Sequence, residues 1–238
     1  MRIISRRELL RTAGAVGAAA MATDASPTAA PSTSQTAPAS GAAAGAAPRE
    51  AYERLTATES DMLEAIVARL IPTDANGPGA IEARAAHYID RALAGALADQ
   101  LEAYRAGFAA FDRYCRSSRG KPFVDLSATD QDSVLIDVES GAATGSGAGF
   151  TGSSAAFFNM VKAHTWQGTF GDPYYGGNAN FVGWDLIGYP GVRTMVTAAD
   201  QQRLEKNELT PNHRSAYDFD GFNKATARAA SHGDHHGD

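Results

Sequence analysis

LTATESDMLEAIVARLIP, residues 55–72, has the start, repeat and stop signals of one amphipathic α-helix. Thr56 and Glu59 stand three residues apart and form a capping-box pair, which satisfies free N–H groups at a helix start. The apolar positions that follow fall on one helix face: Met62, Leu63, Ile66, Val67 and Leu70. Because Pro72 cannot continue a helix, we predict that the helix ends just before it.

The same signals recur along the rest of the chain. Residues 81–114 carry apolar positions every three or four residues, which predicts one long helix or two helices separated near Gly95. Three further helices are predicted from capping residues and apolar spacing: from Ser127 to Gly141, from Ser154 to Thr165, and from Thr197 onward. No clear run of alternating β-branched residues is found, so the predicted fold class is all-α, an irregular helical domain.

The N-terminal stretch SRRELLR, residues 5–11, has the layout of a twin-arginine export signal. Arg6 and Arg7 are followed by Leu9 and Leu10 and then by an Ala- and Gly-rich run. That run is far shorter than the ~20 apolar residues that span a bilayer, so residues 1–22 are predicted to be a signal and not an anchor. The alternative is a basic amphipathic helix that happens to carry two adjacent arginines.

Composition divides the remaining chain. Residues 23–48 consist almost entirely of Ala, Pro, Ser, Thr and Gly, which predicts a disordered linker. Residues 49–228 have the length of one helical domain. The tail, residues 229–238, holds three histidines among acidic residues; it is predicted to be disordered, with weak metal binding as the alternative.

Charge and cysteine content exclude several functions. The formal net charge of −6 becomes −9 once residues 1–22, with four arginines and one glutamate, are removed, so nucleic acid is not an expected partner. Cys115 is the only cysteine, so the chain makes no internal disulfide, four-thiolate iron–sulfur cluster or CxxCH haem attachment. The Gly-rich stretch 141–154 lacks a preceding strand and a Gly-Lys-Ser/Thr ending, so it predicts a loop and no nucleotide site.

The segment HTWQGTFGDPYYGGNANFVGWDLIGYPG, residues 164–191, departs from helical periodicity because glycines and prolines interrupt it. Aromatic side chains held in such a long irregular loop segment are typical anchors of protein interfaces, although some of them are expected to complete the core. The candidate interface residues are His164, Trp166, Phe170, Asp172, Pro173, Tyr174, Tyr175, Gly176, Gly177, Asn178, Trp184 and Tyr189. A catalytic interpretation would make His164 a base near Asp172 or Asp185, but no Ser or Cys nucleophile accompanies it.

This segment, together with RLIPTDANGPGAIEARAAHYIDRAL at residues 69–93, resembles the gluconate 2-dehydrogenase subunit 3 family over residues 52–192. The resemblance implies a non-catalytic, chaperone-like small subunit that escorts a flavoprotein dehydrogenase large subunit through the twin-arginine route to the periplasm. It implies FAD in the partner and no cofactor in this chain. A multihaem cytochrome c subunit, and iron–sulfur or haem groups in partner subunits, are further expectations.

Two alternatives to an accessory subunit stay open from the residues alone. One is an independent exported enzyme or metal-binding protein that uses His164 or the histidines of the tail, which are His232, His235 and His236. The other is a free-standing structural protein whose aromatic segment serves only as core. The substrate of a partner dehydrogenase is not encoded in this chain, because the specificity pocket would belong to the partner.

Overall fold

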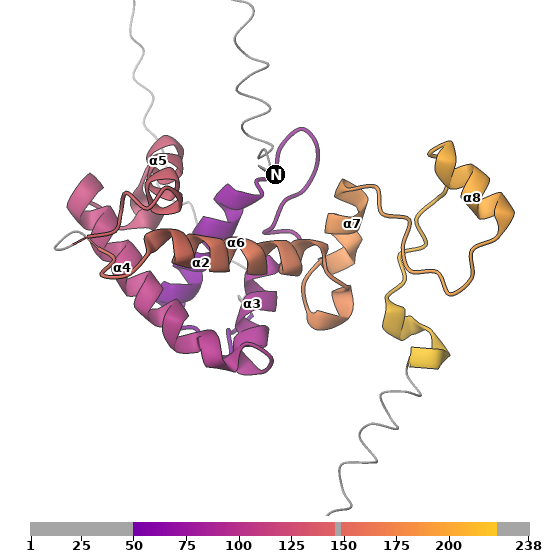
Figure 1. Cartoon of the computed structure of the whole chain (residues 1–238), viewed down its shortest axis with the longest axis horizontal. Coiled ribbons are helices and arrows are strands. Elements are labelled where there is room, and N and C mark those ends of the chain that lie inside the picture. Colours follow the sequence, from indigo (N-terminus) through magenta and orange to yellow (C-terminus); the bar gives the residue numbers. More distant parts are fainter. Residues whose placement is uncertain (1–49, 146–148, 223–238) are drawn as a thin grey trace, which may run out of the picture. The chain divides into compact units, whose positions relative to one another are not determined.

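The computed structural model describes residues 50–145 and 149–222, and Figure 1 shows their helices in chain order. The α-helices are α2 (Ala57–Leu70), α3 (Ala85–Ala94), α4 (Leu101–Arg119), α5 (Ala128–Glu139), α6 (Ser154–Phe170), α7 (Val182–Leu186) and α8 (Ala198–Glu205). Short 3-10 turns join them: η1 (Ala98–Gln100), η2 (Phe123–Asp125), η3 (Pro173–Tyr175), η4 (Ala179–Phe181) and η5 (Ala216–Asp218). Only isolated bridges, and no strand, occur in these two ranges, which confirms the all-α prediction.

The predicted signal (1–22), linker (23–48) and histidine tail (229–238) lie outside the described residues. Within the described ranges, no helix combines the length and apolar character needed to cross a membrane.

Helix α2 begins and ends where the sequence predicts. Thr56 accepts a hydrogen bond from the backbone N–H of Glu59, whose carboxylate accepts from the Thr56 N–H in return. Three consecutive backbone N–H groups just before this cap donate to the buried carboxylate of Asp90 on α3: those of Glu53 at 2.6 Å, Arg54 at 2.9 Å and Leu55 at 2.9 Å. The start of the domain is therefore fixed to α3.

The periodic stretch 81–114 forms two helices, the second of the two predicted alternatives. Helix α3 ends at Ala94 with Gly95 as its C-cap, and the η1 turn leads into α4. The buried face of α4 includes Tyr104, Phe108, Phe111 and Cys115. Cys115 is fully buried, and this burial raises the pKa of its thiol to about 12, as expected of a core cysteine.

Helix α6 contacts α2, α3, α4 and α5, and the core lies between these helices (Figure 1). Aromatic rings from three segments meet there: Phe111 lies 4.8 Å from Phe123 and 6.2 Å from Phe157 between ring centroids. The ring of Phe157 also meets Phe108 and Phe150 at 5.8 Å and 5.6 Å. Burial of these large side chains is the main favourable contribution to folding.

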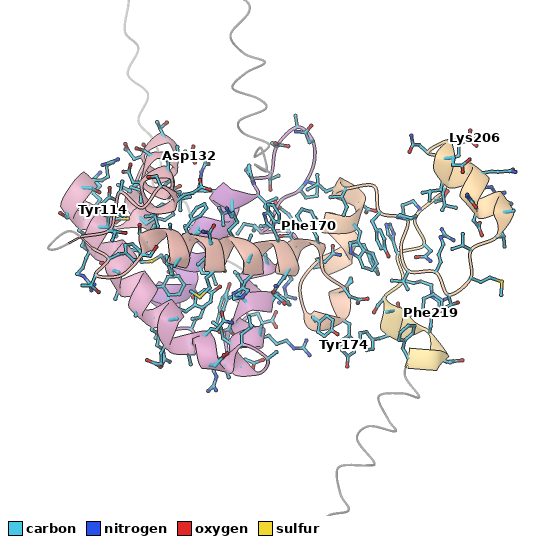
Figure 2. The ribbon with its side chains drawn as sticks, viewed as in Figure 1. Tyr114, Asp132, Phe170, Tyr174, Lys206 and Phe219 are labelled. Atoms are coloured by element: carbon cyan, nitrogen blue, oxygen red, sulfur yellow. The ribbon has the colours of Figure 1, made fainter. Side chains whose placement is uncertain are left out.

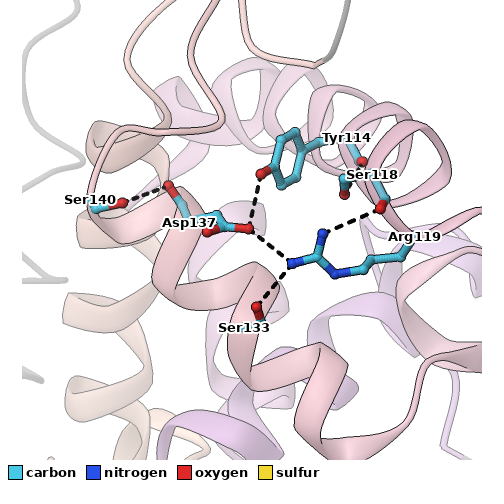
Figure 3. Close-up of polar contacts among 6 residues, drawn as sticks. All are labelled: Tyr114, Ser118, Arg119, Ser133, Asp137 and Ser140. Carbon is cyan, nitrogen blue, oxygen red and sulfur yellow. Dashed lines mark hydrogen bonds and ion pairs between the residues drawn. The ribbon is translucent and has the colours of Figure 1, made fainter.

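Polar contacts join α5 to its neighbours at the rim of the core. Arg69 of α2 donates two hydrogen bonds of 2.8 Å to the Asp132 carboxylate, which Figure 2 labels. Figure 3 shows a second group, in which the Asp137 carboxylate accepts from Tyr114 at 3.0 Å and from Arg119 at 3.2 Å. These residues come from α4 and α5, so the network holds the end of α4 against α5.

Helix α6 extends to Phe170, five residues beyond the predicted end at Thr165. The sequence suggests an earlier end because a glycine stands inside the helix. A Cβ at Gly168 would lie 3.0 Å from the Ala85 Cα and 2.9 Å from the Tyr88 ring, so the missing side chain lets α6 pack closely on α3. Tertiary packing thus outweighs the low helix propensity of glycine.

Candidate partner interface

The candidate interface begins where α6 ends. Asp172 caps the η3 turn by accepting a hydrogen bond of 3.0 Å from the Tyr174 N–H, and Gly176, at φ +94°, closes the turn. This tight turn presents two adjacent tyrosines to solvent: Tyr174 is 49% exposed and Tyr175 is 50% exposed. Figure 2 shows Tyr174 at the tip of this turn.

Asn178 holds the next part of the segment together from the inside. It is fully buried; its N–H donates to the Gly168 carbonyl at 2.6 Å, and its amide Nδ2 donates to the Gly171 carbonyl at 2.8 Å. Its Oδ1 accepts from the Gly183 N–H at 2.8 Å. Asn178 therefore joins the end of α6 to the start of α7, and its side chain is not available to a partner in this structure.

Trp184 has a similar internal role. It is only 5% exposed, its indole Nε1 donates to the Phe170 carbonyl at 2.9 Å, and its ring lies 4.8 Å from that of Tyr189. A Cβ at the preceding Gly183 would overlap the Thr169 carbonyl oxygen, so only glycine fits where α7 crosses α6. The Gly-Trp pair of the motif is thus explained by packing.

His164 is buried within α6 and lies against α4. Its Nδ1 and the Tyr104 hydroxyl share a hydrogen bond of 2.9 Å, and burial lowers the pKa of the imidazole and raises that of the Tyr104 phenol. Asp172 and Asp185, the acids considered as its catalytic partners, contact Ser215 and His213 instead. The arrangement around His164 is that of a structural hydrogen bond.

The structure divides the twelve sequence-predicted interface residues by exposure. His164, Gly177, Asn178 and Trp184 are buried. Phe170, Asp172, Pro173 and Gly176 are partly exposed. Four aromatic side chains remain on the surface: Trp166 at 46%, Tyr174 at 49%, Tyr175 at 50% and Tyr189 at 37% exposed. We call these four side chains, of which Tyr174 and Tyr175 are in ring contact, the aromatic surface.

One part of this region is not predicted by the sequence pattern. Tyr217 of η5 stacks on Tyr174, with ring centroids 3.8 Å apart and planes 20° apart, and its hydroxyl lies 2.6 Å from that of Tyr175. The Asp172 carboxylate accepts from the Ser215 hydroxyl at 2.6 Å and from the Ala216 N–H at 2.9 Å. Ser215 and Asp218 form a capping box, a local signal that could have identified the turn.

Across residues 50–145 and 149–222, no three His, Cys, Asp or Glu side chains are grouped as metal ligands would be. The histidines of the tail lie outside these ranges.

Comparison with curated protein sequences and with solved structures gives no significant match. Comparison with protein families does: residues 57–191, from the start of α2 to the end of the aromatic segment, match the profile described as gluconate 2-dehydrogenase subunit 3. Because the match covers more than half of the 238 residues, the chain belongs to the gluconate 2-dehydrogenase subunit 3 family.

Proposed function

We propose that this chain is a non-catalytic accessory subunit that binds an FAD-dependent dehydrogenase large subunit and escorts it through the twin-arginine route to the periplasm. Membership of the gluconate 2-dehydrogenase subunit 3 family supports a role within a dehydrogenase complex. The observation that carries the binding role is the aromatic surface, which lies within the family-matched residues on a tightly packed frame.

The packing beneath these aromatic side chains keeps them rigid, and rigid side chains bind a partner with little loss of conformational entropy. Tyr174 and Tyr175 are held by the Asp172 cap, and Tyr189 packs on the buried Trp184. Trp166 stands on α6, whose neighbouring residues Thr165 and Thr169 are buried. Exposed Trp and Tyr residues on such a support are the residue types most enriched among energetic centres of protein interfaces.

In the proposed complex the flavin is bound by the partner subunit. The dehydrogenation step and the substrate pocket would then belong to the large subunit, with a cytochrome c subunit as a further candidate member of the complex. This chain would supply the export signal through Arg6 and Arg7 and the binding surface through its aromatic residues.

Co-expression with the flavoprotein large subunit, followed by cell fractionation, tests both roles in one experiment. With Arg6→Lys plus Arg7→Lys, we expect both proteins to stay in the cytoplasm, because the export machinery reads the arginine pair. With Trp166→Ala, we expect this chain to leave while most of the partner stays behind, because binding weakens by about 2 kcal/mol or roughly thirtyfold.

Matched controls keep the two roles separate. Arg2→Lys plus Arg11→Lys retains the arginine pair, and Ile136→Ala truncates a side chain on α5 that is 43% exposed, close to the exposure of Trp166. Both controls should export the two proteins normally. Partner activity in the periplasm at the wild-type level despite loss of the arginine pair would contradict the escort role, and normal partner export with Trp166→Ala would remove that residue from the interface.

A further inference from the structure

The aromatic surface is partly covered by the chain's own C-terminal strap, which we define as Pro211–Phe222. Tyr217 stacks on one face of Tyr174, and its hydroxyl meets that of Tyr175. The strap residues Ser215 and Ala216 both donate to the Asp172 carboxylate, the same group that caps the tyrosine turn. Figure 2 shows Phe219 of the strap and Tyr174 of the turn on these two segments.

A second contact holds the strap next to the aromatic surface. His213 Nε2 lies 2.6 Å from the Asp185 Oδ1, and its ring stacks on Phe181 at a centroid distance of 5.1 Å. Phe181 in turn lies 5.4 Å from the buried Trp184. The strap therefore contacts both the η3 turn and the η4–α7 region.

The grip of the strap is local and weak compared with the packing of the helices. None of its apolar side chains is buried, and Ser215 is its one buried residue. The connecting helix α8 contributes no buried residue either. Segments with few buried apolar contacts and exposed hydrogen bonds open at low free energy, without unfolding of the rest of the domain.

The strap lies outside the residues that match the family profile, because the match covers residues 57–191 and the strap follows them. It thus contacts exposed aromatic side chains of the family-matched part. Of the four residues in the aromatic surface, the strap contacts Tyr174 and Tyr175.

We propose that the strap covers the Tyr174–Tyr175 face in the free subunit and leaves that face when the flavoprotein large subunit binds. This inference rests on the proposed function. In the free subunit Tyr217 occupies one face of Tyr174 while both tyrosines stay about half exposed, and in the complex the partner takes the place of Tyr217 against Tyr174. We expect the same kinds of contact in both states. An aromatic ring stacks on Tyr174 and hydrogen-bond donors reach the Asp172 carboxylate, from the strap in the free subunit and from the partner in the complex.

Hydrogen exchange of the full chain, free and in complex with the large subunit, tests the displacement. The strap amides of Ala216 and Tyr217 donate to Asp172 and Ser215, and they should exchange faster in the complex. The turn amides of Tyr175 and Gly176, which donate to the backbone carbonyls of Asp172 and Pro173, should exchange more slowly in the complex. Slower or unchanged exchange at the strap amides in a complex that forms would overturn the displacement.

An affinity measurement with strap variants provides an independent test. Tyr217→Ala removes the stacked ring and should tighten binding of the large subunit about tenfold, the gain expected when the open form is roughly a tenth of the population. Phe219→Ala is the matched control, because that ring packs against the Arg214 guanidinium within the strap, and it should leave the affinity unchanged.

The outcomes separate the two proposals. Unchanged or weaker binding with Tyr217→Ala would overturn the displacement, since the strap would then be neutral or a partner contact. Failure of the wild-type chain to form any complex would overturn the proposed function itself and, with it, the displacement.

Discussion

Helices α2–α6 and the segment 192–222 belong to one described domain but are held in different ways. Nearly all the buried apolar side chains lie between Leu55 and Val161, whereas residues 192–222 contribute none. The helices are stabilised by burial, with rings such as Phe111 and Phe157 interlocked. The C-terminal segment is held by hydrogen bonds and by rings that stack at the surface, such as Tyr217 on Tyr174.

The two regions therefore differ in how readily their contacts can be replaced. A buried apolar side chain becomes exposed to water only when the helices around it separate. We therefore expect helices α2–α6, the body of the domain, to open as a unit. A surface contact can be exchanged for an equivalent contact with a partner at little cost. The segment 164–191 lies between these extremes, since its buried residues Asn178 and Trp184 support exposed aromatic neighbours.

The largest effect is expected from truncation inside the body. Phe111 is fully buried, so Phe111→Ala should lower the free energy of unfolding by about 3–5 kcal/mol. Leu204→Ala truncates a side chain that is 49% exposed on α8 and should change it by less than about 0.5 kcal/mol. Denaturant unfolding measures both values. Equal losses would show that the C-terminal segment shares the core of the body.

A smaller effect is expected from Asn178, which joins α6 to α7. Asn178→Ala removes two side-chain hydrogen bonds and leaves the Gly171 carbonyl and the Gly183 N–H without their partner, so we expect a loss of about 2 kcal/mol. Asn159→Ala, at an exposed position of α6, is the control and should be close to neutral. An Asn178→Ala protein as stable as wild type would mean that the aromatic segment is held as loosely as the strap.

The smallest effect concerns pH. Burial lowers the pKa of His164, so the folded state favours the neutral ring, whereas the unfolded chain takes up a proton below about pH 6.5. The contribution of this neutral ring is complete above that pH, and the free energy of unfolding falls as the pH drops below it. Because His164→Gln removes the titration and keeps a polar group beside Tyr104, we expect a flatter profile between about pH 5 and 7. An unchanged profile would show that this histidine does not couple to folding.

Local signals explain why much of the helical body could be predicted. The capping residues Thr56, Ser127 and Thr197 act on N–H groups within three residues, so their effect is visible in the sequence. The break near Gly95 was one of two alternatives, and the sequence alone could not choose between them. The end of α6 was predicted too early, because the packing of Gly168 on Ala85 joins residues far apart in the chain.

In the candidate interface, the sequence could not predict which aromatic residues are exposed and which are buried. Exposed tyrosines and the buried Trp184 look alike in a glycine-rich segment, and only the structure separates them. The roles of Asn178 and Asp172 depend on partners at Gly168, Gly183 and Ser215, none of which periodicity brings together. The strap was missed because its attachment to Asp172 spans more than forty residues.

The attachment at Asp90 has a mechanical consequence if the proposed export draws the chain forward by its N-terminal end. A pulling force applied there would enter the described domain close to Glu53, Arg54 and Leu55, whose N–H groups are all bound by the single Asp90 carboxylate. Three hydrogen bonds would then share the force at one buried point on α3, instead of yielding one after another. Beyond this clamp the pull would act directly on the backbone of the first turn of α2, which begins at Ala57.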